Sequence, residues 1–234
     1  MKKVRTLLIV DERMTALTVW REAGALIRRH PVAILIPAAF LGMLVEVPYL
    51  LPDSEYIIQS ILATLTQAFA FYFYVAYAEE VIIEAQSSEH IPFRRALTRL
   101  LRAAPAVPLV TAASVGAIIL PGAAASLLVI PGMWLLTRWS LFAPAIVRER
   151  LGPLTALKRS NELVRGHFEL VFLTAAFAVI LEEAILSLGA LVGLLVSNSQ
   201  TWGEWAGGSV AAILILPLAS LATALTYDSL SHRS

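Results

Sequence analysis

Residues 168–196 read FELVFLTAAFAVILEEAILSLGALVGLLV, and this stretch decides the class of fold. Glu182 and Glu183 interrupt a central part that is otherwise apolar or small. A helix that crosses a bilayer needs about 20 mainly apolar residues, because the hydrocarbon core is about 30 Å thick and each residue rises about 1.5 Å. Continuous rather than alternating apolar residues favour a helix over a strand. The stretch therefore predicts a membrane-spanning helix.

The composition of the whole chain agrees with this prediction. Of its 234 residues 58% are hydrophobic and only 15% are charged, and the mean hydropathy is +0.75. An ordinary soluble domain has roughly 45–50% apolar and about 25% charged residues. A soluble chain of this length could not bury so much apolar surface. The composition excludes a typical soluble enzyme, and the absence of cysteine excludes disulfides and thiol chemistry.

Six apolar windows are long enough to cross a membrane. They cover residues 31–51, 57–83, 105–125, 127–147, 168–196 and 206–228. Only the small-residue stretch 121–126 separates the third window from the fourth, so residues 105–147 form either a simple hairpin or contain a re-entrant element. We expect an all-α integral membrane protein with six transmembrane helices, because lipid leaves the backbone no other way to pair its polar groups here.

The basic residues predict the orientation of these helices. Seventeen of the 18 Lys and Arg residues lie in segments 1–30, 86–104 and 148–167 and in the C-terminal tail; Arg138, inside a window, is the exception. The connections on the opposite side, 52–56, 121–126 and 197–205, carry no Lys or Arg. Because cytoplasmic loops are enriched in Lys and Arg, both termini are predicted to be cytoplasmic, in a bacterial inner membrane. The side chains expected at the outer interface are Tyr49, Tyr56, Trp202 and Trp205.

A basic amphipathic segment precedes every second window. Segments 20–31, 94–105 and 157–168 align by hand so that Arg28, Arg102 and Arg165 coincide. The chain is therefore predicted to be a single domain, 1–234, of three parallel repeats, each an interfacial helix followed by a two-helix hairpin. The repeats cover about 12–85, 90–147 and 153–230; chance similarity is the alternative.

Interfacial helices of this kind attract anionic lipids by about 1 kcal/mol per Lys or Arg. The candidate contacts to lipid headgroups are Arg28, Arg95, Arg99, Arg102, Lys158 and Arg165. The alternative is that these helices only anchor the bundle. A homo-oligomer or another membrane-protein partner is left open. Nucleic acid is not expected as a partner, because the basic segments lack interleaved aromatic residues.

Ionisable residues inside the windows mark a candidate polar site, since each costs roughly 2.5–3.5 kcal/mol at the bilayer centre. The candidates are Glu46, Glu79, Glu80, Arg138, Glu182 and Glu183. Glu182 shares a helical stripe with small residues and is predicted to point inward. Arg138 is predicted to pair with one of the carboxylates, and Glu79, Glu80 and Glu84 with Arg102, Arg148 or Arg165. These groups form either buried ion pairs between helices or an ion or proton pathway.

No pattern typical of an enzyme is present in the sequence. It contains no Gly-rich phosphate loop, no nucleophile elbow and no His-Glu-x-x-His pattern. Its four histidines, His30, His90, His167 and His232, fit interfacial anchoring better than metal binding. We expect no catalytic residues, no metal and no cofactor.

One stretch and the C-terminal end resemble a known family. The matching residues are Pro131-Gly132-Met133-Trp134, Arg138-Trp139-Ser140-Leu141, Pro144, Val147, Glu149-Arg150-Leu151-Gly152-Pro153, Ala156-Leu157-Lys158-Arg159-Ser160, Leu163-Val164-Arg165-Gly166 and Leu225-Thr226-Tyr227-Asp228-Ser229-Leu230. This pattern resembles the membrane domain fused to some glycerophosphoryl diester phosphodiesterases, and related stand-alone bacterial membrane proteins of unknown function. The resemblance implies an integral membrane protein. It does not imply phosphodiesterase activity, because the catalytic part of those enzymes is a separate soluble barrel.

Two functional hypotheses follow. The first is a non-enzymatic protein of the bacterial inner membrane with a scaffolding or lipid-interacting role. The second is a transporter or channel for a small solute or ion that uses the buried glutamates and Arg138. The second hypothesis predicts a continuous polar cavity that reaches these residues.

Overall fold

The computed structural model describes residues 15–50, 56–87, 94, 98, 129–196 and 200–232. The described residues are helical apart from short connections, and no strand occurs among them. The elements are α1 (Ala16–Arg29), α2 (Pro31–Val45), the 3₁₀ helix η1 (Val47–Leu50), α3 (Tyr56–Ser87), α6 (Val129–Trp139), α7 (Phe142–Glu149), α8 (Pro153–Arg165), α9 (Phe168–Val196) and α10 (Gln200–Ser231).

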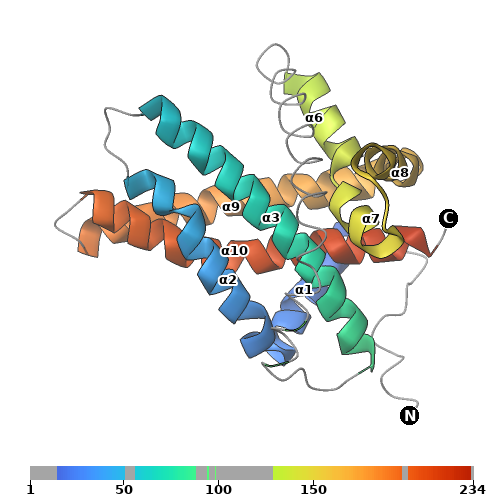
Figure 1. Cartoon of the computed structure of the whole chain (residues 1–234), viewed down its shortest axis with the longest axis horizontal. Helices are drawn as coiled ribbons and strands as arrows, with labels where there is room; N and C mark the ends of the chain where they lie inside the picture. Colours follow the sequence, from blue (N-terminus) through green and yellow to red (C-terminus); the bar gives the residue numbers. More distant parts are fainter. Residues whose placement is uncertain are drawn as a thin grey trace.

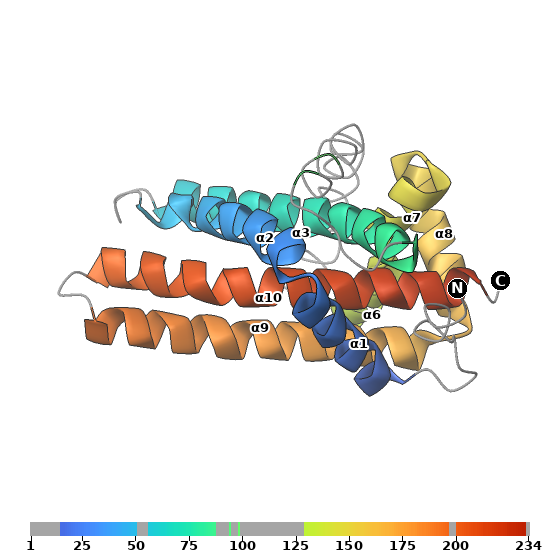
Figure 2. The same ribbon diagram turned by 90° about the horizontal axis from the view of Figure 1, so that it is seen from below.

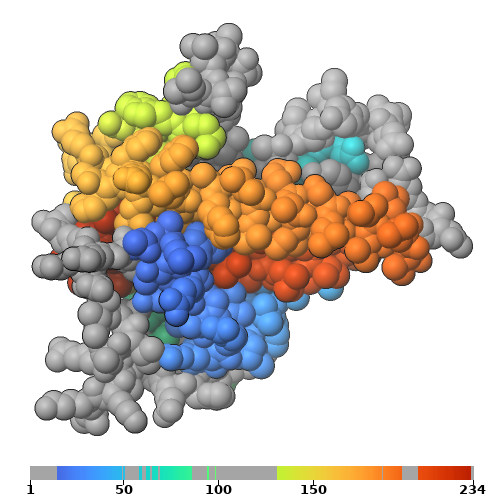
Figure 3. All heavy atoms as spheres, turned by 180° about the vertical axis from the view of Figure 1, so that it is seen from behind, coloured from blue at the N-terminus to red at the C-terminus, as the bar shows by residue number. Residues whose placement is uncertain are grey.

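The long helices form two layers around α10. Helices α9 and α10 run side by side, and α2 and α3 lie across α10 on its other side (Figures 1 and 2). One hydrophobic core joins α1, α2, α3 and α10, and a second joins α3, α7, α8, α9 and α10. Helix α10 is consequently buried over most of its apolar length, whereas α9 is almost entirely unburied (Figure 3).

Two glycines allow α9 and α10 to touch backbone to backbone. A Cβ placed on Gly189 or on Gly207 would collide with the carbonyl group of the other glycine. Gly42 of α2 plays a similar part, since a Cβ there would lie 3.2 Å from the backbone nitrogen of Ile213 on α10. Small residues at helix contacts are the usual way in which helices pack closely in a membrane.

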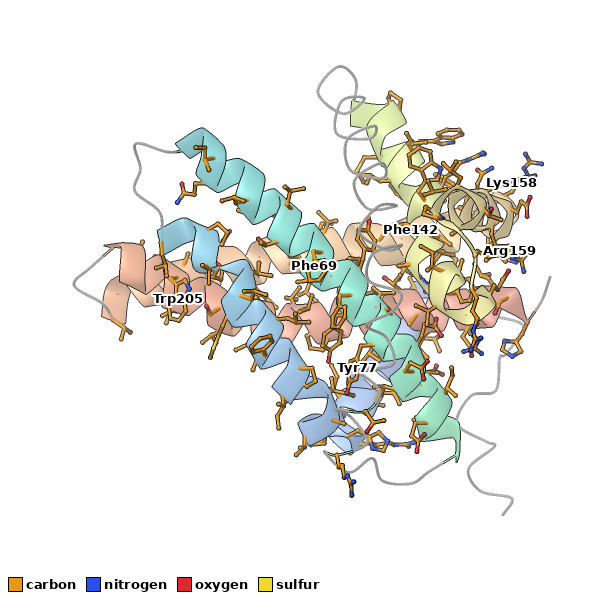
Figure 4. All side chains as sticks on the ribbon, viewed as in Figure 1. Phe69, Tyr77, Phe142, Lys158, Arg159 and Trp205 are labelled. Carbon is orange, nitrogen blue, oxygen red and sulfur yellow. The ribbon has the colours of Figure 1, made fainter. Side chains whose placement is uncertain are left out.

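A proline in α2 is compensated by a tyrosine of α3. Pro37 has no N–H, so the carbonyl of Ala33 loses the partner that an α-helix would give it. The Tyr77 hydroxyl, which is fully buried, donates a hydrogen bond to this Ala33 oxygen at 2.5 Å (Figure 4). Tyr74 donates likewise to Ile34 O at 2.5 Å. The two tyrosines fix α3 against the turn of α2 that precedes Pro37.

Within the part of the chain that the structure describes, two helices are long and apolar enough to cross a membrane, Phe168–Val196 and Trp205–Ser231. A third candidate span exists if α1 and α2, which bend by 100° between Arg29 and Pro31, are counted together. The second, fifth and sixth apolar windows each lie within one helix, whereas the first is divided into α2 and η1 at Glu46. Helix α3, which covers the second window, is not among the candidate spans. The window 105–125 lies outside the described residues.

The fourth window differs from the prediction of one continuous helix over 127–147. The structure divides it into α6 and α7 at Ser140–Leu141. The Leu141 N–H donates to Ser160 Oγ at 3.1 Å, and Ser160 Oγ donates to Arg138 O at 2.8 Å. A side chain of α8 therefore binds backbone groups that an uninterrupted helix would pair internally.

Candidate functional site

The six intramembrane candidates do not form one site. Glu46 and Glu182 line a common cavity, whereas Glu79 and Arg138 lie in two other polar clusters. Glu80 is half-buried beside Glu79 along α3, and Glu183 is exposed on α9. The expectation of a continuous polar cavity through all of them is therefore not met among the described residues.

The cavity shared by Glu46 and Glu182 lies where four helices meet. Its volume is about 30 Å³, which is room for about one water molecule. Its lining residues are Val45 and Glu46 of the α2 end, Gln67 and Phe71 of α3, Glu182 of α9, and Ala212, Ile215, Leu216 and Ala219 of α10. Glu182 lies on this inner side, as its stripe of small residues predicts. Most of the wall is apolar.

Of the two carboxylates in this cavity, Glu182 has a hydrogen-bond partner among the described residues and Glu46 has none. Gln67 Nε2 donates to Glu182 Oε1 at 2.8 Å. The Glu46 side chain is only 8% exposed and makes no hydrogen bond or ion pair with the described residues. It packs on Gly208, where a Cβ would stand 2.7 Å from Glu46 Oε2. Gly208 thus leaves the space that the Glu46 carboxylate occupies.

A second polar cluster lies where α3, α7 and α10 meet. Arg148 donates to Glu79 Oε2 at 3.1 Å and also to Asp228 Oδ1, so one guanidinium bridges two carboxylates. Glu79 is fully buried, and its Oε1 has no hydrogen-bond partner among the described residues. The predicted pairing of Glu79 with Arg148 is present, whereas Asp228 as a second partner was not foreseen.

Glu149 extends this cluster to α8. It accepts hydrogen bonds from the Tyr227 hydroxyl at 2.6 Å and from Arg159 Nε at 2.9 Å. Partial burial alone would raise the pKa of Glu149, but these hydrogen bonds and the Arg159 charge outweigh it and hold the pKa below its usual value. The same contact raises the pKa of Arg159. The cluster ties the ends of α7, α8 and α10 together.

Arg138 has a partner other than the one expected. Its Nη1 donates to Asn161 Oδ1 at 2.8 Å, and the guanidinium lies 4.0 Å from the centre of the Trp134 ring. The prediction that Arg138 pairs with an intramembrane carboxylate is therefore wrong for the described residues. A neutral amide and an aromatic face stabilise the cation in place of a carboxylate.

The two separated parts of the family-like pattern meet in space at these clusters. The Arg148–Asp228 and Glu149–Tyr227 contacts join residues 131–166 to residues 225–230. Neither contact was predicted from the sequence. Their joint presence in one pattern was the available signal that they touch.

Two of the predicted lipid-contacting helices lie within the described residues. Arg28 on α1 and Lys158 and Arg165 on α8 are exposed, and Lys158 extends from the edge of the protein (Figure 4). Leu17 is 71% exposed on α1, and Leu154 is 83% exposed on α8. Arg95, Arg99 and Arg102 lie outside the described residues. Within the described part of the chain, no group of three or more His, Asp or Glu residues could hold a metal ion.

Comparisons with protein-family models, with curated proteins and with solved structures gave no significant match. The class of the protein is accordingly defined by its own architecture. It is an all-helical protein in which two or three helices are long and apolar enough to span a membrane, which indicates membrane association.

Proposed function

We propose that this chain is a non-enzymatic, multi-pass protein of the bacterial inner membrane that binds anionic lipid headgroups through repeated interfacial helices. The proposal includes six spans in three parallel repeats with cytoplasmic termini. It also keeps the resemblance to the membrane domain of glycerophosphoryl diester phosphodiesterases as a prediction. Helices α1 and α8 support the repeat and the binding of lipid headgroups.

The observation that carries the proposal is a pair of exposed leucines at equivalent positions. The alignment that superposes Arg28 on Arg165 also superposes Leu17 on Leu154, and both leucines are largely exposed. It superposes Pro31 on Phe168 as well, and these are the first residues of α2 and α9. This agreement of helix starts supports the proposed repeat.

An exposed leucine beside exposed cations matches the chemistry of a membrane surface. Burial of a leucine in the acyl region stabilises by about 1.5–3 kcal/mol, and each nearby Lys or Arg adds about 1 kcal/mol on an anionic leaflet. The exposed basic residues are Arg21, Arg28 and Arg29 on α1 and Lys158 and Arg165 on α8. Each helix therefore presents an apolar anchor together with a cationic side.

Lipid retention after purification tests the proposal. The full chain is extracted in mild detergent, and the phosphatidylglycerol and cardiolipin bound per protein are measured by native mass spectrometry. We expect the double variant Arg28→Gln/Arg165→Gln to retain several-fold less anionic lipid than the wild type. Arg150→Gln is the matched control, because Arg150 is exposed but lies outside α1 and α8. Equal retention by all three proteins would overturn the proposal.

A transporter of a small ion is the second candidate, favoured by the cavity between Glu46 and Glu182. A volume of about 30 Å³ fits a single small ion rather than an organic solute. Arg138 takes no part in this version, because it lies in another cluster. The test is ion flux in proteoliposomes, which Glu182→Ala should reduce; unchanged flux would exclude this candidate.

A further inference from the structure

The cavity between α2, α3, α9 and α10 holds two acidic groups and no basic one. Helix α9 contributes Glu182, with Glu183 next to it on the exposed side, and the α2 end contributes Glu46. Helix α3 contributes the neutral amide of Gln67, and the lining residues of α10 are apolar. No lysine, arginine or histidine is among the lining residues.

Such an arrangement is unstable as two bare carboxylates. Removal from water disfavours the charged form of a carboxylate that has no counter-charge, because the surroundings have a low dielectric constant. Gln67 supplies one hydrogen bond to Glu182, and Glu46 receives none from the described residues. Among the described residues no basic side chain lines the cavity, so a cation that enters it would supply the counter-charge.

We propose that this cavity binds one monovalent cation, a proton or an ion of the size of sodium, between Glu46 and Glu182. A space of about 30 Å³ has room for one such ion, or for one water that relays a proton. A monovalent ion balances one of the two carboxylate charges, and the Gln67 amide stabilises Glu182 by its hydrogen bond; divalent ions are held by larger sets of oxygen ligands. The proposal is independent of lipid binding and does not require transport.

Gly208 sets the position of the binding group. Because a Cβ at this position would stand 2.7 Å from Glu46 Oε2, any larger residue moves the carboxylate away from its present position. Gly208→Ala is therefore expected to weaken cation binding by displacing the Glu46 carboxylate, without removing either acidic residue.

Carbodiimide labelling of the wild-type chain tests the proposal without a variant. Dicyclohexylcarbodiimide modifies protonated carboxyl groups in apolar surroundings, and mass spectrometry of the full chain in lipid nanodiscs identifies the modified residue. If the bound ion is a proton, Glu46 or Glu182 is labelled near neutral pH, and the labelling falls as the pH rises towards about 9. If the ion is sodium, replacing choline with sodium at constant pH protects these residues, and radioactive sodium binds at one ion per chain.

Two carboxyl groups serve as internal references in the same experiment. Glu162 is exposed on α8 and should remain unlabelled, whereas Glu183 is exposed on α9 and reports on carboxyls that face lipid. Labelling that is confined to Glu183, together with no sodium binding, would overturn the proposal. So would labelling of Glu46 and Glu182 no stronger than that of Glu162 at every pH.

Two substitutions then test whether Glu46 and Glu182 bind one ion together or whether each titrates on its own. Glu46→Gln removes the like charge beside Glu182, so the protonation of Glu182, and with it its labelling, should fall several-fold. Gly208→Ala should lower labelling at Glu46. If Glu46→Gln leaves Glu182 labelling and sodium binding unchanged, the two groups do not share an ion, and the proposal fails.

Discussion

Replacing Arg148 with methionine removes the one cation that bridges Glu79 and Asp228. Glu79 is fully buried and Asp228 is 5% exposed, so both carboxylates lose the guanidinium away from water, while His232 Nδ1 stays 3.7 Å from Asp228 Oδ1. Breaking a buried ion pair from one side costs about 3–5 kcal/mol, because the remaining charge is left uncompensated. We expect Arg148→Met to lower the free energy of unfolding at pH 7 by that amount.

The pH limits this loss of unfolding free energy, because protonation of one carboxylate in the variant removes its uncompensated charge. For a glutamate of ordinary pKa near 4.3, protonation costs about 3.7 kcal/mol at pH 7 and about 1 kcal/mol at pH 5. The destabilisation relative to the wild type should therefore shrink by about 2.7 kcal/mol between these two pH values. This dependence separates an uncompensated charge from a simple loss of packing.

Equilibrium unfolding in mixed micelles, followed by circular dichroism, measures both effects. The triple variant Arg148→Met/Glu79→Gln/Asp228→Asn should recover most of the loss, since no buried charge remains. Arg150→Gln, an exposed neighbour, should change the stability by less than about 0.5 kcal/mol. A loss below about 1 kcal/mol at pH 7, or a triple variant no more stable than Arg148→Met, would refute the reasoning.

Three further predictions concern other contacts. Gly207→Ala should destabilise by about 1–3 kcal/mol because the new Cβ meets the Gly189 backbone, whereas Gly24→Ala, in open space on α1, should stabilise by about 0.5–1 kcal/mol; equal effects in micelle unfolding would contradict this. Tyr77→Phe should cost about 1–3 kcal/mol by leaving Ala33 O unpaired, and less in a Pro37→Ala background that restores the N–H; an equal cost in both backgrounds would be inconsistent. Because the pKa of Glu149 is lowered, its contribution is present above its unfolded pKa and is lost as the pH falls through the folded value, so the stability gap between wild type and Glu149→Gln should close below about pH 4; a constant gap would count against it.

The helices that the sequence predicted best are those whose signal is local. The apolar windows of α2, α3, α9 and α10 need only composition and length, and the boundary at Pro31 follows from proline chemistry. The Gly152-Pro153 pair likewise marks the start of α8. Each of these features can be decided from a few consecutive residues.

The features that the sequence did not predict depend on contacts between distant residues. The break between α6 and α7 requires Ser160, which only the folded chain brings to Arg138 and Leu141. The choice of Asn161 as the partner of Arg138 is likewise tertiary. No local pattern contains this information.

The partner of Glu182 in the cavity shows the same limit, although the inward orientation of Glu182 followed from its stripe of small residues. Neighbouring residues point about 100° apart on a helix, so one of Glu182 and Glu183 faces inward and the other does not. The close Gly189–Gly207 contact with α10 fixes the rotation of α9. Glu182 thereby lines the same cavity as Glu46, although Glu183 is the residue equivalent to Glu46 when Arg28 is superposed on Arg165.

The sidedness of single introduced cysteines tests most directly that the protein crosses the membrane with its basic segments on one side. The chain has no cysteine of its own, so Arg21→Cys, Lys158→Cys and Ser199→Cys each give one reactive site. A membrane-impermeant maleimide is applied to intact spheroplasts and to permeabilised ones. We predict that Ser199→Cys is labelled in intact spheroplasts and that the other two are labelled only after permeabilisation. Labelling of Lys158→Cys from outside intact spheroplasts would contradict the account.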